Sequence, residues 1–195
     1  MSNLFAKLEK EAFRAGITPK TRQSRRWFQK KAQQMNITPR NLMRDERVSV
    51  SSTAGVGSMC MFIYDAKGKG TLPYWDKFPL SIIVGPAEKG FYGINLHYLP
   101  MVLRAQFLDS LLDFTNNKKL DDSTKFQLTY NLLQKAAKTK YFKPCFKHYL
   151  TSQVQGNIAT VSASEWEIAA FLPTADFQGA SNQKVWSDSR SIINA

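Results

Sequence analysis

The chain has 195 residues, 43% of them apolar, so it can bury the core of one domain and is not a wholly disordered chain. Its 27 Lys and Arg outnumber its 15 Asp and Glu, and the net charge of +12 favours an anionic partner such as nucleic acid. Two cysteines are too few for a disulfide framework, and the lack of an apolar run of about 20 residues excludes a membrane-spanning helix.

The positive charge is concentrated near the N-terminus. Residues 1–47 hold 12 basic and four acidic residues, which is +8 of the total charge of +12. This asymmetry predicts three parts: a basic helical extension over residues 1–50, an α+β body over residues 58–173 and a polar tail over residues 174–195. We expect the tail to wrap around the body or around a neighbouring protein.

Helices are expected throughout the extension. Apolar residues at helical spacing predict a first helix over residues 3–15 and a second over residues 19–35. A Thr-Pro pair precedes the second helix at Thr18, and another pair occurs at Thr38. Because Thr can cap a helix and Pro fits its first position, both pairs are interpreted as helix starts.

The body is expected to alternate short strands with longer helices. Apolar runs bounded by Gly and Pro predict strands over residues 59–64, 80–84, 91–96 and 158–161. Helical spacing predicts helices over residues 100–114, 123–138, 146–150 and 164–172. The last of these begins with Ser164 and Glu167 at the spacing of a capping box. Together these elements predict an α+β fold, a small antiparallel sheet packed with helices.

The sequence gives little support to a catalytic or metal site. Cys and His can bind zinc, yet Cys145 and His148 are the only near pair, and Cys60 and His97 lie in separate segments. The same pair would serve as nucleophile and base, but no third group orients them. Buried structural cysteines explain these residues better. We therefore predict no catalytic site, no metal and no cofactor.

The strongest binding signal is a basic stretch between residues 20 and 31. Its side chains can neutralise phosphates, so nucleic acid is the expected ligand. The predicted nucleic-acid-binding residues are Lys20, Arg22, Arg25, Arg26, Lys30 and Lys31. The alternative is a helix that docks on the body through Trp27 and Phe28 and presents its charges to solvent. The phosphate interpretation is preferred because the flanking sequence carries charge of the same sign.

Aromatic residues gather in the middle of the chain, where eight of the 24 lie within residues 62–98. Pro73 and Pro79 stiffen the loop between them, and its large rings offer a rigid contact area. The loop either packs into the core, which the pattern slightly favours, or anchors a neighbouring subunit. The aromatic residues predicted to contact partners are Trp27, Tyr74, Trp75 and Trp186.

Two central motifs carry a family resemblance. They are residues 61–80 (MFIYDAKGKGTLPYWDKFPL) and residues 90–100 (GFYGINLHYLP). The chain resembles virion proteins of large lytic contractile-tailed phages, the set labelled DNA end protector or head completion proteins. The similarity continues through residues 141–150 and 165–173, so it covers most of the body.

The resemblance implies a non-enzymatic role in the virion. Such a protein would sit at the packaged DNA end, complete the head and keep host exonuclease from the terminus. Its expected partners are other virion proteins and the double-stranded DNA end, with no membrane and no small-molecule substrate. Its expected location is the virion and, during assembly, the host cytoplasm. The alternative is a structural component of the phage baseplate or neck, and a nuclease or other enzyme ranks third.

Overall fold

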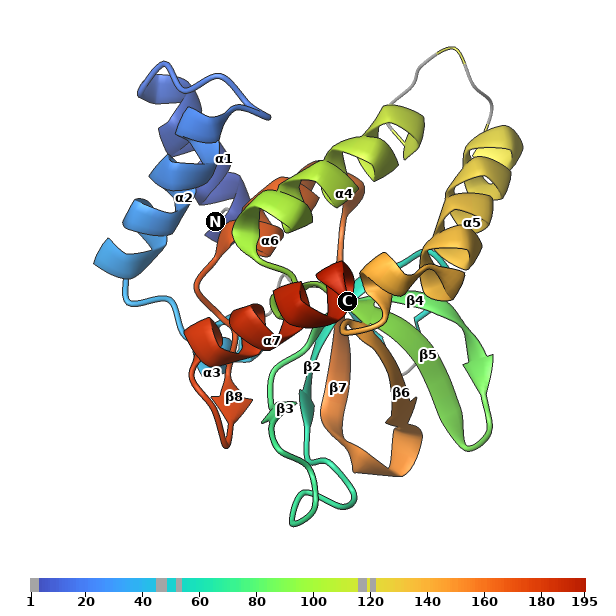
Figure 1. Cartoon of the computed structure of the whole chain (residues 1–195). Coiled ribbons are helices and arrows are strands. Elements are labelled where there is room, and N and C mark those ends of the chain that lie inside the picture. Colours follow the sequence, from blue (N-terminus) through green and yellow to red (C-terminus); the bar gives the residue numbers. More distant parts are fainter. Residues whose placement is uncertain (1–3, 45–48, 52–53, 116–118, 120–121) are drawn as a thin grey trace.

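The computed structural model describes residues 4–44, 49–51, 54–115, 119 and 122–195 (Figure 1). Within these residues an antiparallel sheet is covered by helices, and the first two N-terminal helices pack on a short helix inside that layer. The structure thus confirms the predicted α+β class, a sheet packed with helices.

In the described part of the chain the main sheet has six strands, in the order β1-β7-β2-β4-β5-β6, and all neighbours are antiparallel. A separate two-stranded sheet pairs β3 with β8. The strands are β1 (Ser49–Ser51), β2 (Met59–Tyr64), β3 (Trp75–Asp76), β4 (Leu80–Ala87), β5 (Gly90–Asn95), β6 (Phe146–Leu150), β7 (Val154–Val161) and β8 (Phe177–Gln178).

The sheet separates two apolar clusters. Side chains alternate across a strand, so Met59 and Met61 of β2 point into the main core, which the helices share. Cys60 and Phe62 point to the opposite face and enter a smaller, aromatic cluster. A strand that is apolar on both faces belongs in the centre of a sheet, and β2 lies there, between β7 and β4.

The helices form the layer over the main core. They are α1 (Leu4–Arg14), α2 (Arg22–Gln34), α3 (Pro39–Arg44), α4 (Met101–Thr115), α5 (Asp122–Lys138), α6 (Trp166–Phe171) and α7 (Asn182–Asn194). The 3-10 turns are η1 (Leu96–Tyr98), η2 (Lys140–Phe142), η3 (Thr151–Gln153) and η4 (Ala163–Glu165). All six residues of α6 are buried, because α1, α2 and α4 surround it.

Three local predictions are wrong. Residues 146–150 form strand β6 and not a helix, since β6 pairs with β5 along its whole length, a contact that local spacing cannot show. Helix α2 begins after Thr21 rather than at Pro19, because Thr21 and Ser24 form its capping box. Helix α6 begins at Trp166 without the predicted cap, because Glu167 turns away from its own helix.

The tail packs on the body, which is one of the two arrangements expected from the sequence; the other was packing on a neighbouring protein. Strand β8 pairs with β3, and Val185 of α7 is fully buried in the main core. Leu8 of α1 and Phe28 of α2 enter the same core. Apolar residues of the extension, the body and the tail are packed together. Whether the three parts fold and unfold separately, as the division into three parts implies, stays a prediction. Among the described residues no helix has the length and apolar character needed to cross a membrane.

Candidate nucleic-acid interface

Helix α2 has two sides of opposite character. Arg22, Arg26 and Lys30 are spaced four residues apart, so they line one stripe, and all three are exposed. Phe28 and Ala32 are offset from this stripe by two residues, about 200° around the helix, and they are buried. The periodicity that buries the apolar residues therefore turns the cations to solvent. No ion pair joins the three cations to another residue that the structure describes.

Glu167 of α6 fixes the N-terminus of α2. Its two carboxylate oxygens accept hydrogen bonds from the backbone N–H of Lys20 at 3.0 and 2.9 Å. One of them also accepts from Ser24 Oγ at 2.9 Å. Thr21 Oγ1 completes the cap by accepting from the Ser24 N–H at 3.0 Å. A carboxylate is stabilised there because the helix dipole is positive at this end. Glu167, predicted to cap its own helix, caps a different one.

Two of the six residues predicted to contact phosphate form ion pairs within the protein instead. Arg25 pairs with Asp109 of α4, and its guanidinium lies 5.3 Å from the centre of the Phe171 ring. Lys31 pairs with Glu11 of α1 at 2.7 Å, and this hydrogen bond lowers the pKa of Glu11. These pairs hold α2 between α1 and α4. The other four predicted residues are exposed: Lys20, Arg22, Arg26 and Lys30.

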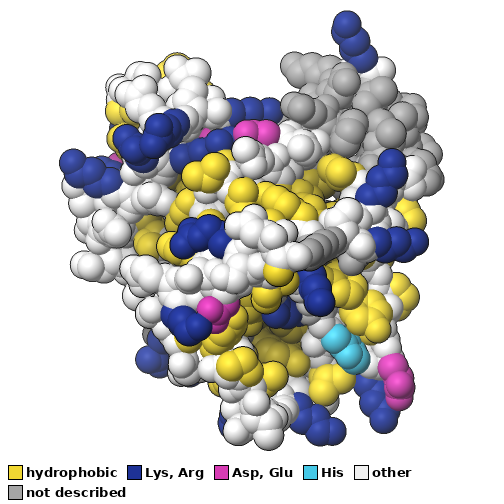
Figure 2. Space-filling model, in the orientation of Figure 1, with side chains coloured by type: hydrophobic (Ala, Val, Ile, Leu, Met, Phe, Trp, Pro, Cys, Tyr) yellow, Lys and Arg dark blue, Asp and Glu magenta, His cyan; other side chains and the backbone are white. Residues whose placement is uncertain are grey.

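A groove of about 530 Å³ runs between α2 and α4 beside the cationic stripe. Its lining residues are Arg22, Arg25, Arg26 and Gln29 of α2, Met101, Val102, Ala105 and Gln106 of α4, and Phe171 of α6. None of these is acidic, and Val102 is 69% exposed. Figure 2 shows Lys and Arg side chains next to hydrophobic surface where α2 approaches α4. Such a surface suits a DNA backbone, which presents phosphates and sugars together.

The aromatic residues predicted to contact partners are half-buried against the chain itself. They are Trp27, Tyr74, Trp75 and Trp186. Trp27 packs edge to face on Phe28, with 5.3 Å between ring centres, and Trp186 Nε1 donates to the carbonyl of His97 at 2.8 Å. Tyr74 and Trp75 line a second pocket. A role of these residues towards partners stays a prediction.

A buried row of polar groups resembles a catalytic relay. His97 Nδ1 lies 2.8 Å from Asp76 Oδ2, and His97 Nε2 lies 3.3 Å from Thr174 Oγ1. Acid, imidazole and hydroxyl occur in this order in hydrolases. However, Thr174 is only 1% exposed and His97 is fully buried, so a substrate cannot reach the hydroxyl. The row joins β3, η1 and the tail.

The two cysteines are buried in different clusters. Burial raises the pKa of Cys60 and of Cys145 to about 12, which keeps both thiols protonated. Each Sγ donates to a backbone carbonyl, that of Ser81 and that of Phe142. In the described ranges, no three His, Cys, Asp or Glu side chains are grouped so that they could hold a metal ion.

Sequence reasoning missed the α4 side of the groove and the role of Glu167. Met101 and Val102 carry no binding signal of their own, and only tertiary packing brings them next to the arginines of α2. Gln29 Nε2 lies 3.3 Å from Met101 Sδ although 72 residues separate them. Glu167 reaches Lys20 across 147 residues. No local sequence signal reveals contacts of this range.

Fold and site together define a class: a basic α+β protein that presents a one-sided cationic helix beside a groove lined by arginines and apolar side chains. A family model described as Phage T4 terminal DNA protecting protein matches residues 1–191. The chain therefore belongs to this family of phage proteins, and the resemblance inferred from the central motifs is confirmed. No curated protein and no solved structure gives a significant match.

Proposed function

We propose that this protein binds the end of the packaged double-stranded DNA and blocks exonucleases there without catalysing a reaction. The observation that carries the proposal is the exposed stripe of Arg22, Arg26 and Lys30 beside the groove between α2 and α4. Phosphate contacts supply nearly all of the affinity of sequence-independent DNA binding. A protector must accept whatever sequence lies at the terminus, and contacts to phosphate and sugar meet that need.

Within this proposal Arg25 and Lys31 position α2 instead of contacting phosphate. Their charges are already matched by Asp109 and Glu11. Such internal pairs make the exposed stripe a fixed surface, so fewer side-chain and backbone rotations are lost when DNA binds. Lys20, which precedes the helix and is exposed, is a further candidate for phosphate contact.

The direct test is protection of linear duplex DNA from a processive exonuclease. The protein is expected to protect each end at a fixed protein-to-end ratio, the same for short and long duplexes. A protein-to-end ratio that must increase with DNA length for full protection would show coating of the duplex and contradict end binding. A separate incubation with DNA and Mg²⁺ should leave the DNA intact, and cleavage that a carboxylate substitution abolishes would overturn the non-enzymatic part.

We further propose that the bound protein stays in the virion, completes the head and contacts other virion proteins. Membership of a phage DNA protecting family supports this location, and Phe13 on α1, 84% exposed, offers an apolar contact for a neighbour. A reconstruction of the intact particle tests it. Density for the chain at the DNA exit of the head is expected. Density in the baseplate or neck, together with no DNA binding at low salt, would establish the structural alternative.

A further inference from the structure

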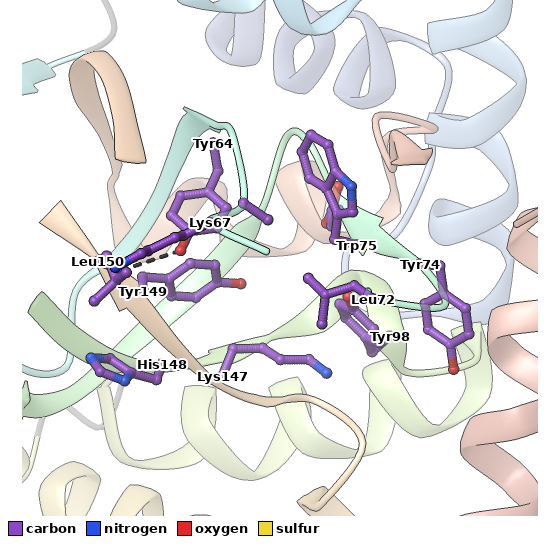
Figure 3. Close-up of a pocket in the computed structure, with 12 residues that line it drawn as sticks. Tyr64, Lys67, Leu72, Tyr74, Trp75, Tyr98, Lys147, His148, Tyr149 and Leu150 are labelled. Carbon is purple, nitrogen blue, oxygen red and sulfur yellow. Dashed lines mark hydrogen bonds between the residues drawn. The ribbon is translucent and has the colours of Figure 1, made fainter. Parts of the chain in front are cut away.

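A second pocket, of about 300 Å³, lies between β6 and the segment that joins β2 to β3 (Figure 3). Aromatic rings from several separate segments line it: Tyr64, Tyr74, Trp75, Tyr98 and Tyr149. Lys67 lies on the side of Tyr64 and Leu150, and Lys147 extends towards Tyr98 and Leu72. The pocket therefore combines aromatic walls with cations on two sides.

Lys147 is the half-buried cation of this pocket. Its Nζ lies 3.9 Å from the centre of the Tyr98 ring, and no ion pair joins it to a described acidic side chain. Burial lowers the pKa of Lys147 to about 8, so an anion bound beside it would stabilise its charged form. Asp76 also lines the pocket, but its carboxylate already accepts hydrogen bonds from Asn95 and Phe78 and pairs with His97.

The size and the chemistry of the pocket fit a single nucleotide. Its volume is at the lower end of pockets that bind small molecules, and a duplex cannot enter it. Nucleotide bases stack on aromatic side chains, and phosphates pair with Lys. We propose that the pocket takes the terminal nucleotide of a DNA strand, with its base against Trp75 and its phosphate near Lys147 and Lys67. This inference rests on the proposed function and names what the protein recognises at an end.

Such a pocket distinguishes an end from continuous duplex. A base must leave the stack to enter it, which is unfavourable within a duplex and least so where the base is already unpaired. A terminal base has one stacking neighbour instead of two, so it leaves more readily. The stripe on α2 binds phosphates anywhere on a duplex, and the pocket adds the preference for the terminus.

The first test titrates the full chain with deoxyadenosine 5′-monophosphate, with deoxyadenosine and with inorganic phosphate. The nucleotide should bind at least tenfold more tightly than either part alone, because it uses both the rings and the lysines. Trp75→Ala, which removes a stacking surface worth ~1–3 kcal/mol, should weaken nucleotide binding about 5- to 150-fold. Lys67→Gln, at an exposed position that cannot disturb the core, should weaken it as well, and Lys143→Gln outside the pocket should not. A nucleotide that binds no better than phosphate would overturn the inference.

The second test compares a linear duplex with a relaxed closed circle of the same sequence. The wild type should prefer the linear form, whereas Lys147→Met and Trp75→Ala should lose this preference and keep the affinity for the circle. Pocket variants that retain the end preference would refute the terminal-nucleotide assignment. If the wild type binds neither DNA, the proposed function fails, while the nucleotide titration still decides whether the pocket binds its ligand.

Discussion

Asp76 holds together the junction of β3, η1 and the tail. Its carboxylate accepts hydrogen bonds from the Phe78 N–H at 3.0 Å and from Asn95 Nδ2 at 2.9 Å, and it pairs with His97. Burial raises the pKa of Asp76, but the charge and hydrogen bond of His97, with the bonds from Asn95 and Phe78, outweigh burial and lower it. The ionised carboxylate therefore stabilises the folded state.

Asp76→Asn should lower the free energy of unfolding by about 3 kcal/mol at pH 7, because it leaves buried partners without their acceptor. Urea unfolding followed by tryptophan fluorescence measures this. The wild-type contribution is present above the unfolded-state pKa, near 3.9, and is lost as the pH falls through the lower folded pKa. The difference between wild type and variant should thus shrink below about pH 4. Asp65→Asn, in an exposed pair with Lys69, is the control and should change stability by less than about 0.5 kcal/mol.

The two thiols should be inert in the folded protein. With the pKa of Cys60 and Cys145 raised to about 12, about one thiol in ten thousand is ionised at pH 8, and both are shielded from reagents. Iodoacetamide at pH 8 should modify neither within an hour, and both after unfolding in urea, as mass spectrometry would show. Rapid labelling of the native chain would contradict the burial of the cysteines.

At the residue scale the sequence predicts which apolar side chains are buried, but it does not predict which polar side chains form hydrogen bonds with one another. The sequence predicts buried structural cysteines, because a free Cys behaves as a small apolar residue, and both are buried. For His97 the residue type alone suggests only a zinc ligand. Its partners Asp76 and Thr174 lie 21 and 77 residues away, so no spacing in the sequence marks the network that the three form.

At the scale of elements, Glu167 anchors the N-terminal end of α2, in addition to the ion pairs and the apolar contacts of that helix. Glu167→Ala removes the acceptor of the Lys20 N–H and of Ser24 Oγ and an ion pair near Arg25. Hydrogen bonds to a charged group contribute ~1.5–3 kcal/mol, so amide exchange in α2 should accelerate by about 10- to 150-fold. Exchange in β2 and β4 should change less. Glu88→Gln, at an exposed loop position, is the control, and unchanged protection of α2 in Glu167→Ala would show that Glu167 does not hold the helix.

The stripe on α2 should set the salt dependence of DNA binding. Replacing Arg22, Arg26 and Lys30 by Gln removes up to three phosphate contacts, and each lowers the slope of log K against log salt by about 0.9. Filter binding or fluorescence anisotropy at several salt concentrations should show a slope smaller by about 2 to 3 units.

The matched control for the stripe removes three exposed cations elsewhere: Lys89, Lys138 and Lys143, each changed to Gln. The protein keeps the same net charge as the stripe variant, so a general electrostatic effect would appear in both. An equal loss of slope in the two variants would mean that no particular surface binds DNA. An unchanged slope in the stripe variant alone would move the interface away from α2.

Long elements were predictable from the sequence and short ones were not. Helices α4 and α5 have apolar residues at helical spacing, and strand β2 is a continuous apolar run, so the sequence predicts all three. Strands β3 and β8 contain two residues each and exist only because they pair with each other. The sequence predicts a helix over residues 146–150, where the structure has strand β6, because pairing with β5 is a tertiary contact that local preference does not show.

At the scale of the whole molecule, the N-terminal helices, the sheet and the tail share one apolar core. Leu8 of α1, Phe28 of α2, Ile82 of β4 and Val185 of α7 belong to a single cluster of buried residues. Helices α1 and α2 have 11 and 13 residues, and isolated helices shorter than ~12–15 residues are marginal in water. Both helices are therefore stable only while they pack on this core, and the core in turn needs them to shield its apolar residues from solvent.

The chain should consequently unfold as one cooperative unit. Native-state hydrogen exchange at increasing urea, read by mass spectrometry, measures the opening free energy of each segment. The most protected amides around Leu8, Phe28 and Val185 should approach the value found around Ile82 as urea is raised, because losing any one part exposes the apolar residues of the others. An independent extension would behave differently. Its amides would open at a lower free energy with little dependence on urea. Residues 1–50 would then be a separate unit, and DNA or a virion partner could undock it from the body.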